Sequence, residues 1–268
     1  MILRSITAAG LALIMALPLA KPAEAGAWDQ TAGQGLLISS FSYYQVGVQG
    51  YNQFGRPTGK GTYIQEEFSP YLEYGLTDRW TIGLQPRLQA ITQSGLPGTG
   101  HAYGLVQLNL FARYQIYRDD NNAFAAQGQI GVPGTASVRV PQLAMPSGEY
   151  EARLLYGHNL TLAGVPAYLD VEAAYRLESD GYADQIRGDA TLGVTPFQNW
   201  QILAQSFNTI SVGHAVPGQS DYDLYRVELS AVYSITKALA VQVGAWHDVG
   251  GRNIALGNAG VAALWWRF

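Results

Sequence analysis

The chain has 268 residues, of which 13% are charged, 48% hydrophobic and 12% aromatic, and its formal net charge is -4. A soluble domain usually carries about 25% charged residues, and disordered chains combine high net charge with few aromatics. Disordered chains and basic nucleic-acid-binding proteins are therefore excluded. The absence of cysteine also excludes disulfide scaffolds, thiolate metal sites and cysteine nucleophiles.

Residues 1–25 have the layout of a secretory signal peptide, with a positive start, an apolar stretch at 6–19 and an A-x-A cleavage site, AEA, at 23–25. A second site of this form, AGA at 25–27, makes a cut after Ala27 an alternative. The apolar stretch is shorter than the ~20 residues that span a bilayer, which argues against a membrane anchor. We expect the signal peptide to be removed and residues 26–268 to form one mature domain.

After this leader the hydrophobic pattern has a period of two. In one block Val106, Leu108 and Leu110 alternate with Gln107 and Asn109, which places the two sets on opposite faces of a strand. Twelve such blocks follow one another, at 34–45, 61–75, 79–91, 102–118, 123–133, 149–161, 166–177, 185–197, 199–211, 222–235, 238–248 and 255–268.

The connectors between these blocks alternate in length. Long ones lie at 46–60, 92–101, 134–148, 178–184, 212–221 and 249–254, and short ones at 76–78, 119–122, 162–165, 198 and 236–237. An even strand number with this alternation is typical of a bacterial outer-membrane barrel, whose short turns face the periplasm. We predict an all-β transmembrane, antiparallel up-and-down β-barrel of twelve strands. A secreted β-sandwich would have strands of about five to six residues and more charge.

The last predicted strand ends with large apolar residues at alternate positions. Leu264, Trp266 and Phe268 lead to a terminal aromatic, and this ending resembles the signal read by the machinery that inserts barrels into the outer membrane. We therefore expect the barrel-assembly machinery and outer-membrane lipid as partners. No nucleic-acid partner, cofactor or metal is expected.

The charged residues of the strands share one register. When the apolar register is assigned to lipid, Glu66 alone among the charges remains on that side, where a mid-depth charge would cost about 2–4 kcal/mol. The inward register also carries the aromatics Tyr71, Phe111, Tyr168 and Trp246. Its charged members are Glu67, Glu73, Arg87, Arg113, Glu151, Arg153, Asp170, Glu172, Arg176, Arg187, Asp189, Arg226, Glu228, Asp248 and Arg267.

Arginine rather than lysine fills this inward register. The planar guanidinium pairs bidentately with carboxylates and stays charged when partly buried, which predicts a ladder of cross-strand pairs, such as Arg87 with Glu67 or Glu73. Two interpretations stay open. The pairs either stiffen and fill the barrel, or line a narrow passage that selects a small solute. Twelve strands lie between the filled eight-stranded barrel and the open sixteen-stranded one, so size does not decide.

Two stretches carry a family resemblance: GAW at 26–28 with GQG at 33–35 leading into SFSYY at 40–44, and EYGLTDRWTIGL at 73–84. They resemble a proteobacterial outer-membrane family labelled as a meta-pathway phenol degradation protein. That family is similar in kind to the outer-membrane transporters of fatty acids and aromatic hydrocarbons. The resemblance implies an outer-membrane location and uptake of small organic compounds. Fatty-acid transporters carry an N-terminal plug, but only residues 27–33 precede the first strand here, so no plug is expected.

A lipid hydrolase is the least favoured function. Some outer-membrane barrels carry a Ser-His-Asn site, which requires a histidine in reach of a serine. His158 is followed by Asn159, but Asn159 points to the opposite face and the strand offers no serine. We therefore expect no enzymatic activity and predict a passive pore or transporter for small organic solutes, aromatic or apolar. The alternative is a structural or surface-interaction barrel acting through the connectors 46–60 and 134–148.

Overall fold

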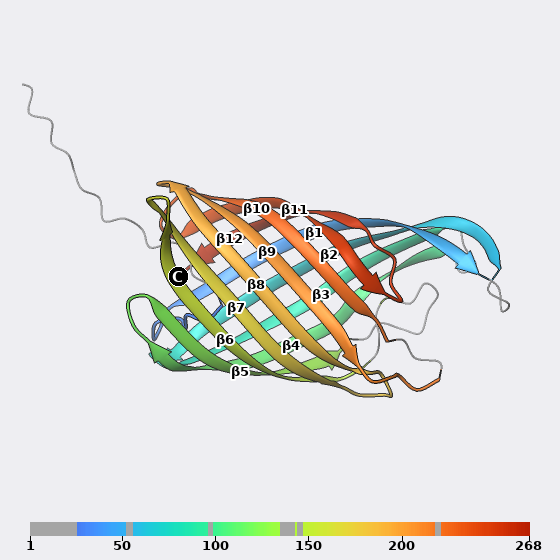
Figure 1. Ribbon diagram of the computed structural model, residues 1–268, viewed down its shortest axis with the longest axis horizontal. Helices are drawn as coiled ribbons and strands as arrows, with labels where there is room; N and C mark the ends of the chain where they lie inside the picture. The colour runs from blue at the N-terminus through green and yellow to red at the C-terminus, as the bar shows by residue number, and fades with distance from the viewer. Residues whose placement is uncertain (1–25, 52–55, 96–98, 135–142, 144–146, 218–220) are drawn as a thin grey trace, which may run out of the picture.

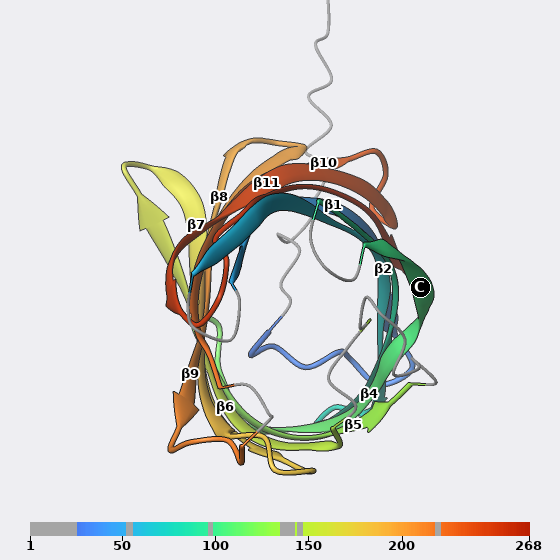
Figure 2. The ribbon, with the colours of Figure 1, turned by 90° about the vertical axis from the view of Figure 1, so that its right-hand side faces the viewer.

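The computed structural model describes residues 26–51, 56–95, 99–134, 143, 147–217 and 221–268, so the predicted signal peptide lies outside it. The described residues form twelve antiparallel strands and no helix (Figure 1). Each strand pairs with its neighbours in the chain, and the last pairs back with the first. The sheet is therefore a closed barrel, seen nearly end-on in Figure 2. The predicted fold is confirmed.

The strands agree with the sequence prediction to within a few residues at most ends. They are β1 (Gly35–Tyr51), β2 (Pro57–Thr77), β3 (Trp80–Ser94), β4 (Gly100–Arg118), β5 (Asn122–Pro133), β6 (Glu149–Leu162), β7 (Val165–Glu178), β8 (Asp184–Phe197), β9 (Trp200–Val212), β10 (Asp223–Ser234), β11 (Leu239–Arg252) and β12 (Asn258–Arg267).

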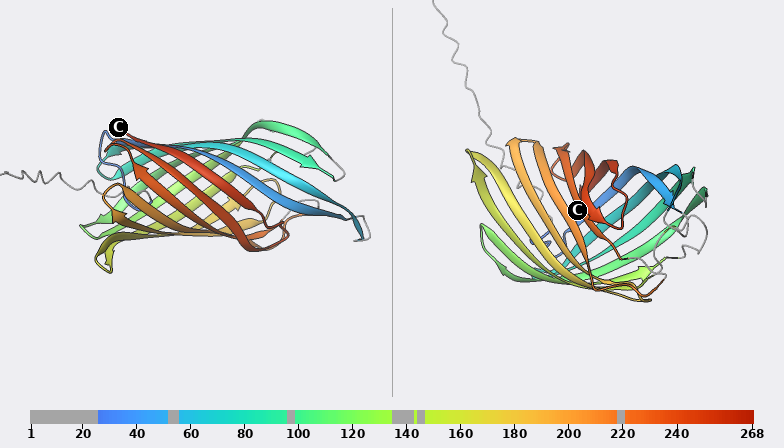
Figure 3. Two further views of the ribbon diagram at one scale, coloured as in Figure 1. Left: turned by 90° about the horizontal axis from the view of Figure 1, so that it is seen from above. Right: turned by 45° about the vertical axis from the view of Figure 1, so that its right-hand side comes forward.

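The long connector predicted at 46–60 is the largest error. β1 and β2 stay paired from Val46↔Tyr63 to Tyr51↔Pro57, so most of this stretch is strand. Glycine is depleted in strands in general, and the glycines at 47, 50, 59 and 61 concealed the pairing. The hairpin projects beyond the neighbouring strands, as the side views show (Figures 1 and 3).

The outer wall of the barrel is apolar. Leu229, Val243 and Leu154 expose more than half of their surface on this wall, and a soluble protein rarely exposes a continuous apolar face of this kind. Pairs of aromatic rings lie near the short turns, with centroids 4.9–5.1 Å apart, in Trp80–Tyr114, Trp200–Tyr233 and Trp266–Phe268. An apolar belt bordered by aromatic residues is typical of a barrel that crosses the bacterial outer membrane, which is the location of this protein. No helix in the described ranges is long and apolar enough to cross a membrane.

A β-bulge between β3 and β4 corrects one predicted orientation. Arg87 pairs with Gln107, but the next residue, Leu88, pairs with Leu105, so Val106 is the extra residue. Its side chain therefore turns inward, where it is 3% exposed in a small apolar cluster. The alternation at 106–110 had placed Val106 on the lipid face. A bulge shifts the phase of the pattern by one residue, and the sequence alone does not reveal that shift.

Candidate functional site: the barrel lumen

Two cavities follow one another along the lumen. The inner cavity, nearer the short turns, has a volume of about 450 Å³ and is lined by residues that include Gly26, Arg113, Tyr168 and Trp265. The outer cavity has a volume of about 550 Å³, and its lining includes Tyr63, Arg87, Leu143, Tyr222 and Arg226. Arg176 lines both cavities. Polar, charged and aromatic side chains share each lining, so the site combines apolar surface with fixed charge.

Residues 26–34, named here the N-terminal segment, lie inside the barrel (Figure 2). The segment runs across the inner face of the barrel and forms hydrogen bonds with several strands. Its contacts are Gly33 N–H to the Gly75 carbonyl of β2 at 2.9 Å, Gln30 N–H to Thr81 Oγ1 of β3 at 3.1 Å, Asp29 N–H to Gln115 Oε1 of β4 at 3.0 Å and Ala27 N–H to Asp170 Oδ2 of β7 at 2.8 Å. No plug was expected before the first strand, but these nine residues do lie inside the lumen. Polar side chains of the lumen satisfy their buried backbone amides.

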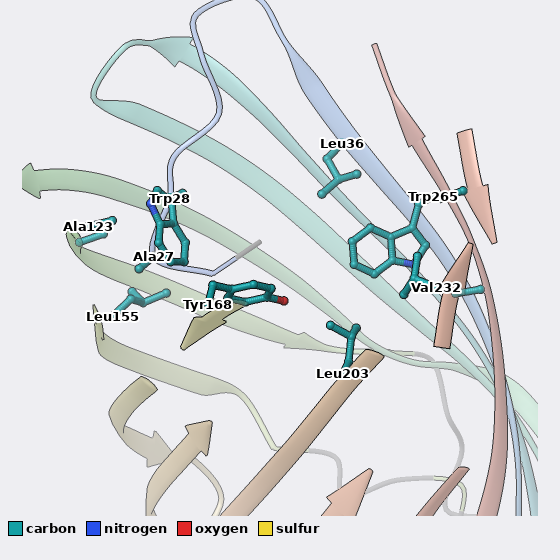
Figure 4. Packing of buried hydrophobic residues seen from close by; sticks show 12 residues of the cluster. Ala27, Trp28, Leu36, Ala123, Leu155, Tyr168, Leu203, Val232 and Trp265 are labelled. Carbon is teal, nitrogen blue, oxygen red and sulfur yellow. The ribbon is translucent and has the colours of Figure 1, made fainter. Parts of the chain in front are cut away.

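Trp28 is the main apolar anchor of this segment. Its side chain is almost fully buried and meets Tyr168 edge-to-face, with ring centroids 6.0 Å apart. Figure 4 shows it beside Ala123, Leu155 and Tyr168. Its ring lies over Gly157, where an added Cβ would be only 2.4 Å from the ring atoms. A glycine at this inward position of β6 therefore makes room for the indole.

Asp29 ties the segment to an ion-pair cluster on β2 and β4. Arg113 donates to Glu73 Oε2 at 3.3 Å and to the Tyr71 hydroxyl at 3.0 Å, and its Nε lies 4.0 Å from Asp29 Oδ1. Asp29 is 4% exposed. This burial raises the pKa of its carboxyl to about 6, although the charge of Arg113 opposes the shift. Tyr71 also stacks on Phe111, with centroids 5.4 Å apart, so two of the four predicted inward aromatics pack against this cluster.

A second ion-pair cluster spans β6, β7 and β8. Arg153 pairs with Glu151 at 2.7 Å, with Asp189 at 2.6 Å and with Glu172. Arg176 pairs with Glu151 at 2.9 Å and with Glu149 at 2.7 Å, and Arg187 lies 3.6 Å from Glu151. These side chains enclose one side of the inner cavity. Since Arg176 also reaches the outer cavity, the cluster forms the boundary between the two spaces.

The outer half of the lumen holds separate pairs. Arg87 binds Glu67 with two nitrogens, at 3.2 and 2.9 Å. Arg226 donates to Asp248 at 2.7 Å, and its guanidinium lies 4.8 Å from the centroid of Trp246. Elsewhere on the inner wall, Glu228, on the same strand as Arg226, accepts hydrogen bonds from Ser230 and Gln242, and Arg267 lies beside Trp265 at the C-terminal end of β12.

These contacts place the charged residues predicted for the inward register on the inner wall. Of the two partners offered for Arg87, the structure selects Glu67, whereas Glu73 pairs with Arg113. Asp170 lies under the N-terminal segment and accepts the Ala27 N–H. A role for these residues in selecting a solute stays a prediction. Sequence reasoning missed the segment together with its polar contacts Thr81 and Gln115, and inward glycines within strands are the signal that could have indicated it.

The four histidines have partners other than serine. His158 Nδ1 lies 2.9 Å from Asn122 Oδ1, and His247 Nδ1 lies 2.7 Å from Asn258 Oδ1. His101, at the start of β4, contacts Thr92, and His214, in the connector after β9, contacts Asp221. This arrangement does not offer the hydrogen-bonded serine and histidine that a hydrolase of this kind needs.

Comparison with known proteins places the fold among outer-membrane barrels. The COG4313 outer membrane channel from Pseudomonas putida F1 is 16% identical over 91% of this chain and 99% of its own, with a TM-score of 0.66. The β domain of the Bordetella autotransporter BrkA is 16% identical, with 88% and 100% covered and a TM-score of 0.53. The NanC porin is 9% identical, with 85% and 98% covered and a TM-score of 0.50. No protein-family profile and no curated protein sequence matches the chain. At these identities the likeness concerns the fold.

Proposed function

We propose that this barrel is a passive channel for small organic solutes that combine an apolar or aromatic body with a polar group, and that the N-terminal segment closes its periplasmic end. The observation that carries the proposal is the pair of cavities along the lumen, which share Arg176 in their linings. Each cavity presents aromatic or aliphatic surface beside arginine and carboxylate groups, as a ligand of mixed character requires.

The size of the cavities supports a small solute. Binding pockets for small molecules typically span about 300–1,000 Å³, and both lumen cavities lie in the lower half of this range. The resemblance to the phenol degradation family and the likeness to channels of known structure both favour transport. Phenol and benzoate are therefore suitable first test solutes, because one carries a neutral hydroxyl and the other a carboxylate on the same ring.

The test is solute flux into liposomes that contain the refolded barrel, together with single-channel recording. We expect flux of phenol or benzoate above that of empty liposomes, and we expect Arg176→Ala to change it. Arg252→Ala is the matched control, because Arg252 pairs with Asp221 and Asp223 at the exposed outer end of the barrel. If Arg176→Ala lowers the melting temperature but leaves permeability unchanged, the charged network has a structural role and the channel proposal fails at this site.

A further inference from the structure

The N-terminal segment ends against a buried carboxylate. Asp170 on β7 is 4% exposed and accepts the Ala27 N–H at 2.8 Å. Gly26 touches the same group, since a Cβ added to it would lie 2.4 Å from Oδ2 and 2.7 Å from Oδ1. The φ angle of Gly26 is also +92°, a conformation that residues other than glycine rarely adopt. Position 26 is therefore fitted closely to the carboxylate beside it.

Asp170 forms no direct ion pair in the part of the chain that the structure describes, and Arg113 acts on it only at longer range. The ion pairs around the inner cavity join four arginines, at 113, 153, 176 and 187, to seven acids. Asp170 is an eighth acid, and its carboxyl lies next to that of Glu172, which already shares Arg153 with two other acids. A buried charge without a partner is costly. The carboxyl of Asp170 thus lacks a direct ion pair, although four arginines line the same cavity.

We propose that the missing cation is the α-ammonium group of Gly26, formed when a signal peptidase cleaves the chain after Ala25. Water hydrolyses the Ala25–Gly26 peptide bond, the leader leaves with the new carboxylate, and the nitrogen of Gly26 becomes a protonated amine. This nitrogen is bonded to the Cα that lies against Asp170. Asp170 and Glu172 then form the binding site of the new N-terminus, and processing of the chain creates the contact that holds the segment in the lumen.

The structure also bears on which of the two possible cleavage sites in the sequence is used. A cut after Ala27 would remove Gly26 and Ala27, the residues that contact Asp170. Ala27 is fully buried, and its carbonyl accepts a hydrogen bond from Gln115 Nε2 at 3.1 Å. The fit of both residues to the lumen therefore favours the cut after Ala25.

The first test is the mass of the intact protein extracted from the outer membrane. We expect a chain of residues 26–268, and a chain that begins at Trp28 would overturn the proposal. Neither result depends on solute transport, so the outcome is independent of the proposed channel function.

The second test measures how fast an amine-acylating reagent modifies the α-amine of Gly26 in the folded mature barrel, with peptide mapping to distinguish it from Lys60 and Lys237. We expect acylation at least tenfold slower than in a free Gly-Ala-Trp-Asp peptide, and Asp170→Asn to restore most of the rate. Glu228→Gln is the control, since this inward acid on β10 contacts Ser230 and Gln242 and has no contact with Gly26 or Ala27. An α-amine in the wild-type barrel that reacts as fast as the peptide overturns the proposal, even if the Asp170 variant fails to fold.

Discussion

Replacing Gly157 with valine should release the N-terminal segment from the lumen. A Cβ at this position would lie 2.4 Å from two ring atoms of Trp28. The indole is rigid, and the backbone on either side of it is held by Asp170 and Gln115, so the ring has to leave its site. Valine is itself favoured in strands, so β6 should persist. The substitution therefore acts on the segment and not on the wall.

The size of the effect follows from the burial of Trp28. A buried tryptophan removes about 150–250 Å² from solvent, and at ~25 cal/mol per Å² this amounts to about 4–6 kcal/mol as an upper limit. A loss of half that free energy would raise the undocked population about 30- to 150-fold, since each 1.4 kcal/mol corresponds to a factor of ten.

Single-channel recording in planar bilayers checks this prediction. We expect Gly157→Val barrels to spend more time in a conducting state of higher conductance than the wild type, and Trp28→Ala to behave in the same way. Gly128→Val on the adjacent β5 is the matched control, because nothing lies within 4 Å of a Cβ added there. If the Gly157 variant folds, as judged by heat-modifiable mobility in gels, and conducts like the wild type, the reasoning about closure by the segment is refuted.

Three further predictions concern charge and assembly. Arg176→Ala leaves three acids, Glu149, Glu151 and Glu178, with one partner fewer, and the loss of a buried partner costs about 3–5 kcal/mol. We expect a lower melting temperature and a reversal potential shifted toward cation selectivity, and an unchanged potential would contradict this. The pKa of the Asp29 carboxyl is about 6 when docked against an ordinary value of 3.8, so this carboxyl opposes docking least below about pH 4 and increasingly as the pH rises toward 6. Conductance should therefore rise more steeply over this interval in the wild type than in Asp29→Asn, and equal slopes would exclude Asp29 as a cause. Phe268→Ala removes the ring that packs on Gly35 at the barrel seam; we expect less folded protein in outer-membrane fractions by immunoblot, and equal amounts would rule out this role.

The strands were predictable because each residue of a barrel wall meets one of two environments, lipid or lumen. The alternation therefore identifies the inward-facing charges directly. Arg87 of β3 pairs with Glu67 of the neighbouring strand β2, as the sequence predicted. The inward orientation of Val106 was not predicted, because a β-bulge shifts the inward–outward alternation by one residue without a distinct residue pattern.

Other contacts of the site could not be read from periodicity. Glu73 of β2 reaches Arg113 of β4 past the intervening strand, where Gly83 pairs with Glu73 and Phe111 and has no side chain in the way. The N-terminal segment has no periodicity, and its contact with Asp170 joins positions 143 apart in the chain. Such contacts depend on how the barrel closes in three dimensions, which local patterns do not encode.

The seam between β1 and β12 has a consequence for the order of folding. Nearly all strand pairs form between chain neighbours, but Leu36 pairs with Arg267, and closing a loop of roughly 230 residues costs about 5 kcal/mol of chain entropy. Ten paired positions and two hydrogen bonds between Gly35 and Phe268 have to outweigh this cost. The open sheet should therefore accumulate before the ring closes. β12 is then the last strand to dock, and it docks on β1, which directly follows the N-terminal segment. Closure of the ring and entry of the segment thus occur at the same edge, so seam variants should slow both steps together.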